Sequence, residues 1–133
     1  MQHDEFIGLV QNRARLSSRG DAERATRAVL ETLGERIPEG LAGNLAAQLP
    51  HEIGEHLRRT EVYAGAGTGE RFDRPDFIAR VAERAGVHDP QAAYLTRAVA
   101  EVVDETTQGA LMAKLTDSLP ADIRGLVTAG STG

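Results

Sequence analysis

The chain has 133 residues, of which 41% are hydrophobic, 26% charged and 4% aromatic, with no cysteine, no tryptophan and a formal net charge of −5. The lack of cysteine excludes a disulfide framework, a thiolate nucleophile and any metal site built on cysteine, so a reducing cytoplasm is the expected compartment. The negative charge disfavours non-specific binding to nucleic acid or to anionic lipid.

Apolar residues of the first half recur at helical spacing. Phe6, Val10 and Ala14 predict a first helix. A longer second helix follows, with an apolar stripe of Ala22, Ala25, Val29, Leu33 and Ile37. A third helix carries Leu41, Leu45 and Leu49. Proline disfavours the helical conformation of the residue before it, so Pro50 is expected to end this helix and to open a short fourth one with Ile53 and Leu57.

The second half repeats this order. Its four stripes are Phe77, Val81 and Ala85; Ala92, Leu95, Val99, Val102 and Thr106; Leu111, Leu115 and Leu119; and, after Pro120, Ile123 and Val127. Residues 26–57 match residues 96–127 at an offset of 70, with eleven of 32 pairs identical. Residues 4–16 match residues 75–87 at an offset of 71, with five of 13 identical. The sequence therefore predicts an internal duplication of one unit.

These patterns predict an all-α fold of eight helices, made of two tandem four-helix pseudo-repeats packed into one bundle. The single domain, residues 1–133, divides into repeat one (3–58), a glycine-rich linker (59–72), repeat two (73–128) and a disordered tail (129–133). A repeat of this size is marginal alone, so the two are expected to share a core. A phosphate-binding loop is a poor interpretation of the linker glycines, because no strand precedes them and no Lys-Ser/Thr follows.

Three helix starts carry capping residues. Ser18 with Asp21, and Asp73 with Asp76, resemble capping boxes, the latter around Pro75. Asp89 is the expected N-cap of the long helix of repeat two, with Pro90 at its first position.

The densest group of metal-ligand residues is His51-Glu52-Ile53-Gly54-Glu55-His56. A zincin helix needs histidines at i and i+4, but the fifth position here is Glu55. The inverted motif His-x-x-Glu-His also fails, because Glu52 stands where its first histidine should be. His51, Glu55 and His56 are thus the only candidate ligands, repeat two has no histidine at the equivalent positions, and a solvated polar face is the preferred interpretation. No metal or other cofactor is expected, and His3 and His88 are taken as isolated loop or cap residues.

Catalytic patterns are not found either. No serine lies in a nucleophile elbow, and the glutamates of the second helix fall on its polar side, away from any predicted pocket. Arg27 with Glu31, and Arg97 with Glu101, are i, i+4 pairs at equivalent places, and Arg13 corresponds to Arg84. These charges are expected to form ion pairs within or between helices, with a partner-binding surface as the alternative.

Three elements together resemble a known family. They are the Phe-Ile motif at Phe6 and Phe77 with its flanking acidic residues, the repeated Thr-Arg-Ala-Val at Thr26 and Thr96, and the repeated Leu-Pro at Leu49 and Leu119. The chain resembles the bacterial domain of unknown function 2267 over residues 3–128. That resemblance implies an all-helical, internally duplicated protein, and it brings no catalytic or binding residues.

The expected function is a cytoplasmic, non-enzymatic helical module for interaction or regulation, with a protein partner or a second copy in a homodimer. No basic n-region opens the chain, and no apolar run approaches the roughly 20 residues that span a bilayer, so no membrane association is expected. Two alternatives stay open. One is a nucleic-acid binder, whose basic stretch would be the arginines of residues 13–27, although Asp21 and Glu23 interrupt it. The other is a ligand binder or enzyme with a site between the repeats.

Overall fold

The computed structural model describes residues 2–37, 39–64, 73–109 and 121–128, and all the regular structure in these ranges is helical. The helices are α1 (His3–Arg13), α2 (Arg19–Arg36), α3 (Glu39–Ala47), α4 (His51–Ala64), α5 (Arg74–Ala85), α6 (Asp89–Thr106) and α8 (Ala121–Thr128). The all-α prediction is confirmed. The helix predicted around Leu111, Leu115 and Leu119, the linker glycines and the tail lie outside the described residues.

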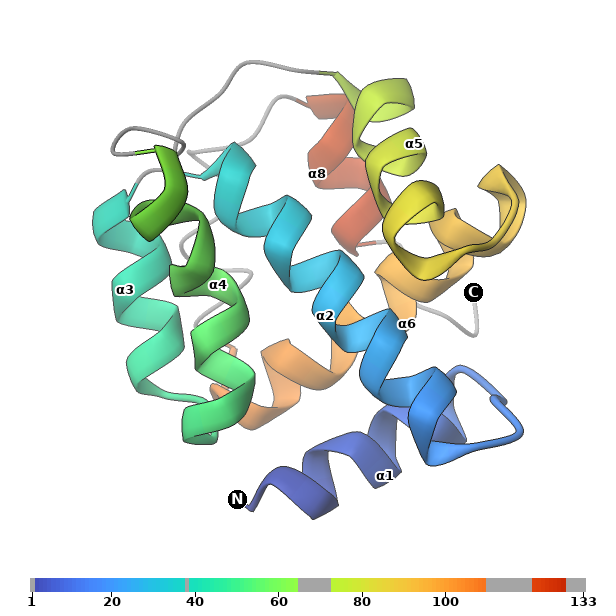
Figure 1. The fold of residues 1–133 in the computed structure, drawn as a ribbon, viewed down its shortest axis with the longest axis horizontal. Coiled ribbons are helices and arrows are strands. Elements are labelled where there is room, and N and C mark those ends of the chain that lie inside the picture. Colours follow the sequence, from blue (N-terminus) through green and yellow to red (C-terminus); the bar gives the residue numbers. More distant parts are fainter. Residues whose placement is uncertain (1, 38, 65–72, 110–120, 129–133) are drawn as a thin grey trace.

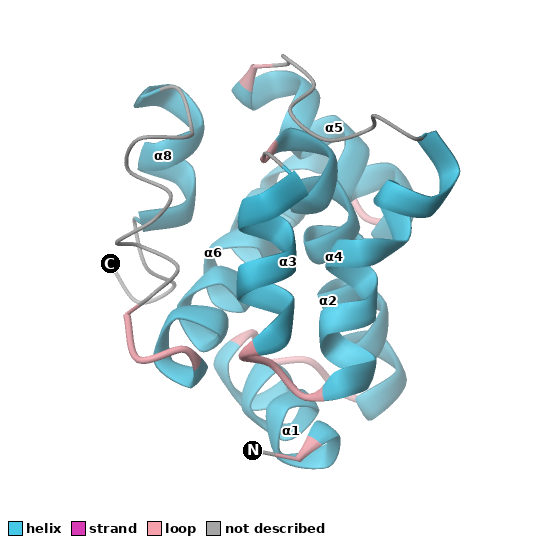
Figure 2. Cartoon of the chain, turned by 90° about the vertical axis from the view of Figure 1, so that its left-hand side faces the viewer, coloured by secondary structure: helices cyan, strands magenta, loops and turns pink. Residues whose placement is uncertain are grey.

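Two long helices of 18 residues each, α2 and α6, organise the bundle. In Figure 1, α3 and α4 lie on one side of α2, and α5 and α8 on the other. Figure 2 shows α3 and α4 side by side, with α4 packed against α2. Both α1 and α5 contact α2 and α6, so each short helix that opens a predicted repeat touches the long helices of both.

Helix starts follow the capping residues, with one correction. The Ser18 side chain accepts a hydrogen bond from the Asp21 backbone N–H at 3.1 Å, and Asp73 accepts one from the Asp76 N–H at 3.1 Å. The predicted N-cap Asp89 is instead the first residue of α6, and His88 precedes it as N-cap without a side-chain cap bond. The error is one residue, because Pro90 fits either of the first two helical positions.

The core is continuous across the two halves. Phe6 and Phe77 are fully buried, as are Leu45, Ile53 and Ile123 from the predicted stripes. Thr26 and Thr96 are buried at equivalent positions, and each hydroxyl donates to the backbone carbonyl four residues earlier at 2.8 Å, which satisfies its hydrogen bonding without a partner helix.

Helix α4 continues to Ala64, through residues 59–64 where the sequence led us to begin the linker. Its packing on α3 is close. Gly54 is buried, and a Cβ atom added to it would lie 2.6 Å from the Ala46 carbonyl oxygen of α3. The absence of a side chain at Gly54 therefore sets the distance between these two helices. None of the helices in the described ranges is long and apolar enough to cross a membrane.

Candidate functional site

The three candidate metal ligands do not converge on one point. His51 is 78% exposed in the first turn of α4, and its Nε2 lies 3.8 Å from Glu55 Oε1. His56 instead lines a hollow against α2. Across the described ranges, no three His, Asp or Glu side chains are placed to hold one metal ion.

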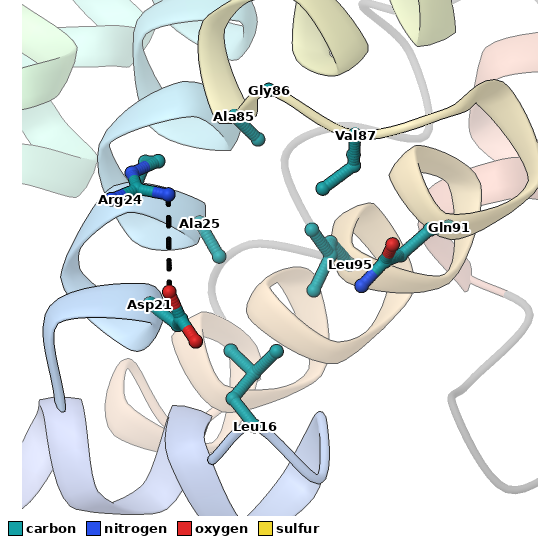
Figure 3. A pocket seen from close by; sticks show the side chains of 9 residues that line it. All are labelled: Leu16, Asp21, Arg24, Ala25, Ala85, Gly86, Val87, Gln91 and Leu95. Carbon is teal, nitrogen blue, oxygen red and sulfur yellow. Dashed lines mark ion pairs between the residues drawn. The ribbon is translucent and has the colours of Figure 1, made fainter. Parts of the chain in front are cut away.

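A pocket lies where the two predicted repeats meet, which we call the junction pocket (Figure 3). Its volume is about 130 Å³, and it is bounded by the α1–α2 loop, the first turns of α2, the end of α5 and the start of α6. The side chains or backbone that line it belong to Leu16, Asp21, Arg24, Ala25, Ala85, Gly86, Val87, Gln91 and Leu95. Three equivalent pairs contribute to this lining: Leu16 with Val87, Asp21 with Gln91, and Ala25 with Leu95.

The same backbone turn places Leu16 and Val87 in the pocket. The Leu16 N–H donates to the Gln11 carbonyl at 2.9 Å, and the Val87 N–H donates to the Ala82 carbonyl at 3.0 Å, each closing a wide turn at a helix end. The residue before each is in the left-handed region, Arg15 with φ 55° and Gly86 with φ 71°. The turn after α5 thus has a glycine at the left-handed position, and the turn after α1 has an arginine there, which is strained.

This difference predicts opposite effects of two substitutions. Arg15→Gly should raise the free energy of unfolding by about 0.5 kcal/mol, because it removes a left-handed non-glycine residue from an exposed turn. Gly86→Ala should lower it by about 1 kcal/mol for the same backbone reason, since nothing lies within 4 Å of the added Cβ. Urea unfolding of both variants measures the changes. Equal signs would show that the two turns are not equivalent.

The polar groups of the junction pocket lie at its rim. Asp21 and Arg24 form an ion pair at 3.8 Å, and their side chains are 42% and 55% exposed. Asp21 also accepts a 3.4 Å hydrogen bond from Ser17. With Leu16, Val87 and Leu95 on its walls, the pocket can take a small apolar group beside a charged rim.

Arginine and glutamate side chains connect the two halves reciprocally. Arg13 of α1 hydrogen-bonds Glu101 of α6, and it bonds Glu105 at 2.9 Å. Arg84 of α5 lies 2.7 Å from Glu35 of α2, and its Nε lies 4.0 Å from Glu31 Oε1. Arg13 corresponds to Arg84, Glu31 to Glu101 and Glu35 to Glu105, so the two sets contain the same residue types at equivalent places.

These ion pairs shift the pKa of two of the residues that form them, Glu35 and Arg13. Burial alone would raise the pKa of Glu35, but the hydrogen bonds and charges of Arg84 and Arg80 outweigh it and hold that pKa below its ordinary value of 4.5. The pKa of Arg13 is raised, first by its hydrogen bond to Glu105 and then, against the cost of burial, by the charges of Glu105 and Glu101. The charges thus act between helices, as one of the two sequence-based interpretations had it.

The predicted i, i+4 pairs are not found. Neither Arg27 nor Arg97 has an ion pair among the described residues, because Glu31 and Glu101 lie against arginines of the other half. Part of the basic stretch considered for nucleic-acid binding is also paired with carboxylates. Arg13, Arg19 and Arg24 each pair with a carboxylate, of Glu101, Asp4 and Asp21 respectively.

The comparison with curated proteins gives no match for this chain. The comparison with protein families matches residues 3–126 to the family described as "Uncharacterized conserved protein (DUF2267)". The match covers all seven described helices apart from the last residues of α8. The chain belongs to the DUF2267 family.

Proposed function

We propose that this protein is a non-enzymatic helical interaction module of the bacterial cytoplasm, built from two tandem copies of one unit. The proposal rests on where the charged side chains lie at the junction of the two halves. Arg13 and Arg84 are tied to glutamates of the opposite half, whereas the neighbouring pocket has apolar walls and one exposed ion pair. This combination suits a fixed scaffold that receives a side chain from a partner.

Equivalent local structures support the tandem origin. Helices α1 and α5 end in the same wide turn, and α2 and α6 are of equal length. The buried threonines, Thr26 and Thr96, make the same bond. The reciprocal Arg–Glu bridges have the form of an isologous interface, in which the same surface is used on both sides. A duplication of one self-complementary unit accounts for all four features.

The contact surface of this module is the junction pocket. Leu16 and Val87 are only partly buried although they pack against the core, which leaves apolar area at the mouth of the pocket. An apolar side chain of a protein segment would fill this space, and a basic or acidic neighbour on that segment would meet Asp21 or Arg24. A second copy of the chain is one such partner.

The test compares Leu16→Gln with Leu9→Gln, which changes another partly buried leucine that packs on the core outside the junction pocket. Each variant and the unaltered protein are used as bait in the native host at physiological salt, and bound proteins are quantified. Light scattering of the same samples detects self-association. We expect Leu16→Gln to reduce the recovery of a specific partner, or the dimer, by about tenfold, because it places an amide in an apolar contact. Leu9→Gln should leave recovery unchanged.

The proposal fails if no reproducible partner or dimer is found, or if both variants behave alike although circular dichroism shows them folded. In that case the junction pocket has another use.

A small-ligand binder is the second candidate, and the observation that favours it is the position of the pocket between the repeats, with Asp21, Arg24 and Gln91 as polar groups. A saturable thermal shift in a metabolite screen, abolished by Gln91→Ala and retained in Arg27→Gln, would support it, because Gln91 lines the junction pocket and Arg27 does not.

A further inference from the structure

Arg27 is a cation that the Arg–Glu bridges between the two halves do not engage. It lies exposed on α2, one turn before Glu31. That carboxylate is 16% exposed and is directed to Arg84 of α5, with 4.0 Å between Glu31 Oε1 and Arg84 Nε. No ion pair of Arg27 is found in the described part of the chain. The bridge between the repeats therefore leaves a cation at the surface of repeat one.

Arg27 shares a hollow with two other groups that can donate to an anion. The hollow lies between the first turns of α2 and helix α4, and it is lined by Gly20, Glu23, Arg24, Arg27 and His56. Its volume is about 280 Å³. Pockets for small ligands span about 300 to 1,000 Å³, so this hollow lies just below that range and has room for a small anionic group.

The remaining charges around the hollow are partly engaged elsewhere. The Glu23 carboxylate lies 3.7 Å from Nε2 of His3, which forms an ion pair with it only when the imidazole is protonated. His3 lies at the start of α1 and is also within 4.0 Å of Glu52. Within the described ranges, the ion pair of Arg24 is its long, half-exposed contact with Asp21. Two arginines thus face one carboxylate in the hollow, in a chain whose net charge is −5.

We propose that Arg24, Arg27 and His56 form an anion-binding site that takes the phosphate group of a small ligand, a function beyond the interaction proposed above. The guanidinium groups would each donate a pair of hydrogen bonds to phosphate oxygens, the contact for which the planar arginine side chain is best suited. His56 would donate from the α4 side of the hollow. The carboxylate of Glu23 limits the site to weak, salt-dependent binding.

Repeat two supplies the comparison. The positions equivalent to Glu23, Arg24 and His56 are Ala93, Tyr94 and Leu126. Of these charged and histidine positions, repeat two therefore keeps only Arg97, the equivalent of Arg27. The Nε atom of Arg97 is buried without a hydrogen-bond partner, whereas Arg27 opens into the hollow. Removing the charge of Arg97 therefore changes the net charge of the protein as much as removing that of Arg27, without touching the proposed site.

The experiment titrates inorganic phosphate into the ¹⁵N-labelled full chain, with sodium chloride at matched ionic strength as the reference. Binding is followed through backbone amide and arginine Nε–H resonances. Saturable shifts are expected at Gly20, Arg24, Arg27 and His56. Arg27→Gln should weaken phosphate binding by at least about tenfold, because it removes a charge-assisted contact. Arg97→Gln and Arg19→Gln, whose arginine pairs with Asp4 at 2.9 Å, should bind phosphate as the unaltered protein does.

Three results would overturn the proposal. They are shifts no larger than those caused by chloride, shifts spread over arginines throughout the protein, or equal weakening by Arg27→Gln and Arg19→Gln. The last would show that phosphate responds to general charge only. Arg27 is exposed, so its variant is expected to keep the fold, and circular dichroism with the unfolding midpoint verifies this. These outcomes are independent of Leu16, so this proposal and the interaction proposal can fail separately.

Discussion

Gly54→Ala should lower the free energy of unfolding by about 3 kcal/mol, because the new methyl group would lie 2.6 Å from the Ala46 carbonyl oxygen. That oxygen cannot rotate away, since it belongs to the backbone of α3 and accepts a hydrogen bond from the Leu49 N–H at 3.2 Å. Helices α3 and α4 would have to separate, and Leu45 and Ile53, both fully buried, lie on these two helices. The loss would be measured by urea or thermal unfolding, with a midpoint roughly 10 °C lower.

Gly43→Ala is the matched control for this prediction. Gly43 lies on α3, in the same pair of helices, and nothing lies within 4 Å of a Cβ built on it. Alanine favours the helix over glycine by about 0.5 to 1 kcal/mol, so this variant should be slightly more stable than the unaltered protein. If Gly54→Ala were as stable as Gly43→Ala, the two helices would not be in backbone contact at this point.

The contrast between these two glycines shows what sequence patterns can and cannot predict. The helices and several of their starts follow from local rules, so Ser18, Asp73 and the paired apolar stripes predicted them. Gly43 and Gly54 both read as glycines within helical segments, and no local rule tells the one that touches another backbone from the one that faces open space. That distinction depends on how α3 crosses α4, which is a property of the packed chain.

The candidate sites also depend on how the helices pack, and not on the spacing of residues along one helix. The i, i+4 spacing pointed to Arg27 as the partner of Glu31, since spacing along one helix is all that a sequence displays directly. The structure brings Arg84 to that carboxylate from α5, because α5 packs on the long helices of both halves. The equivalence of Arg13 and Arg84 was visible in the repeat alignment, but their partners were not. The hollow beside Arg27 likewise joins residues of two helices, α2 and α4, that lie far apart in the sequence.

Arg84→Met should lower the free energy of unfolding by about 2 kcal/mol near neutral pH, because it removes a cation that contacts two partly buried carboxylates. Glu31 and Glu35 are 16% and 18% exposed, and Arg84 also donates to the Thr32 hydroxyl at 2.7 Å. Arg13→Met should cost about 1 kcal/mol, because its partner Glu101 is 28% exposed but its other partner Glu105 is 50% exposed, so solvent screens that second contact. Arg19→Met, which removes an exposed ion pair of similar length, should cost less than about 0.5 kcal/mol.

The pH dependence of stability separates the charge of Arg84 from its packing. Glu35 has a pKa below 4.5 in the folded protein, whereas in the unfolded chain it has its ordinary value. The bridge therefore contributes its full stabilisation above pH 4.5, and loses it as the pH falls through the folded pKa, where the carboxylate binds a proton. Urea unfolding over this range should show the difference between the unaltered protein and Arg84→Met shrinking with acid. A difference that stayed constant would mean that Arg84 stabilises the junction through its methylene groups, and that the Arg–Glu bridges do not hold the two halves together by charge.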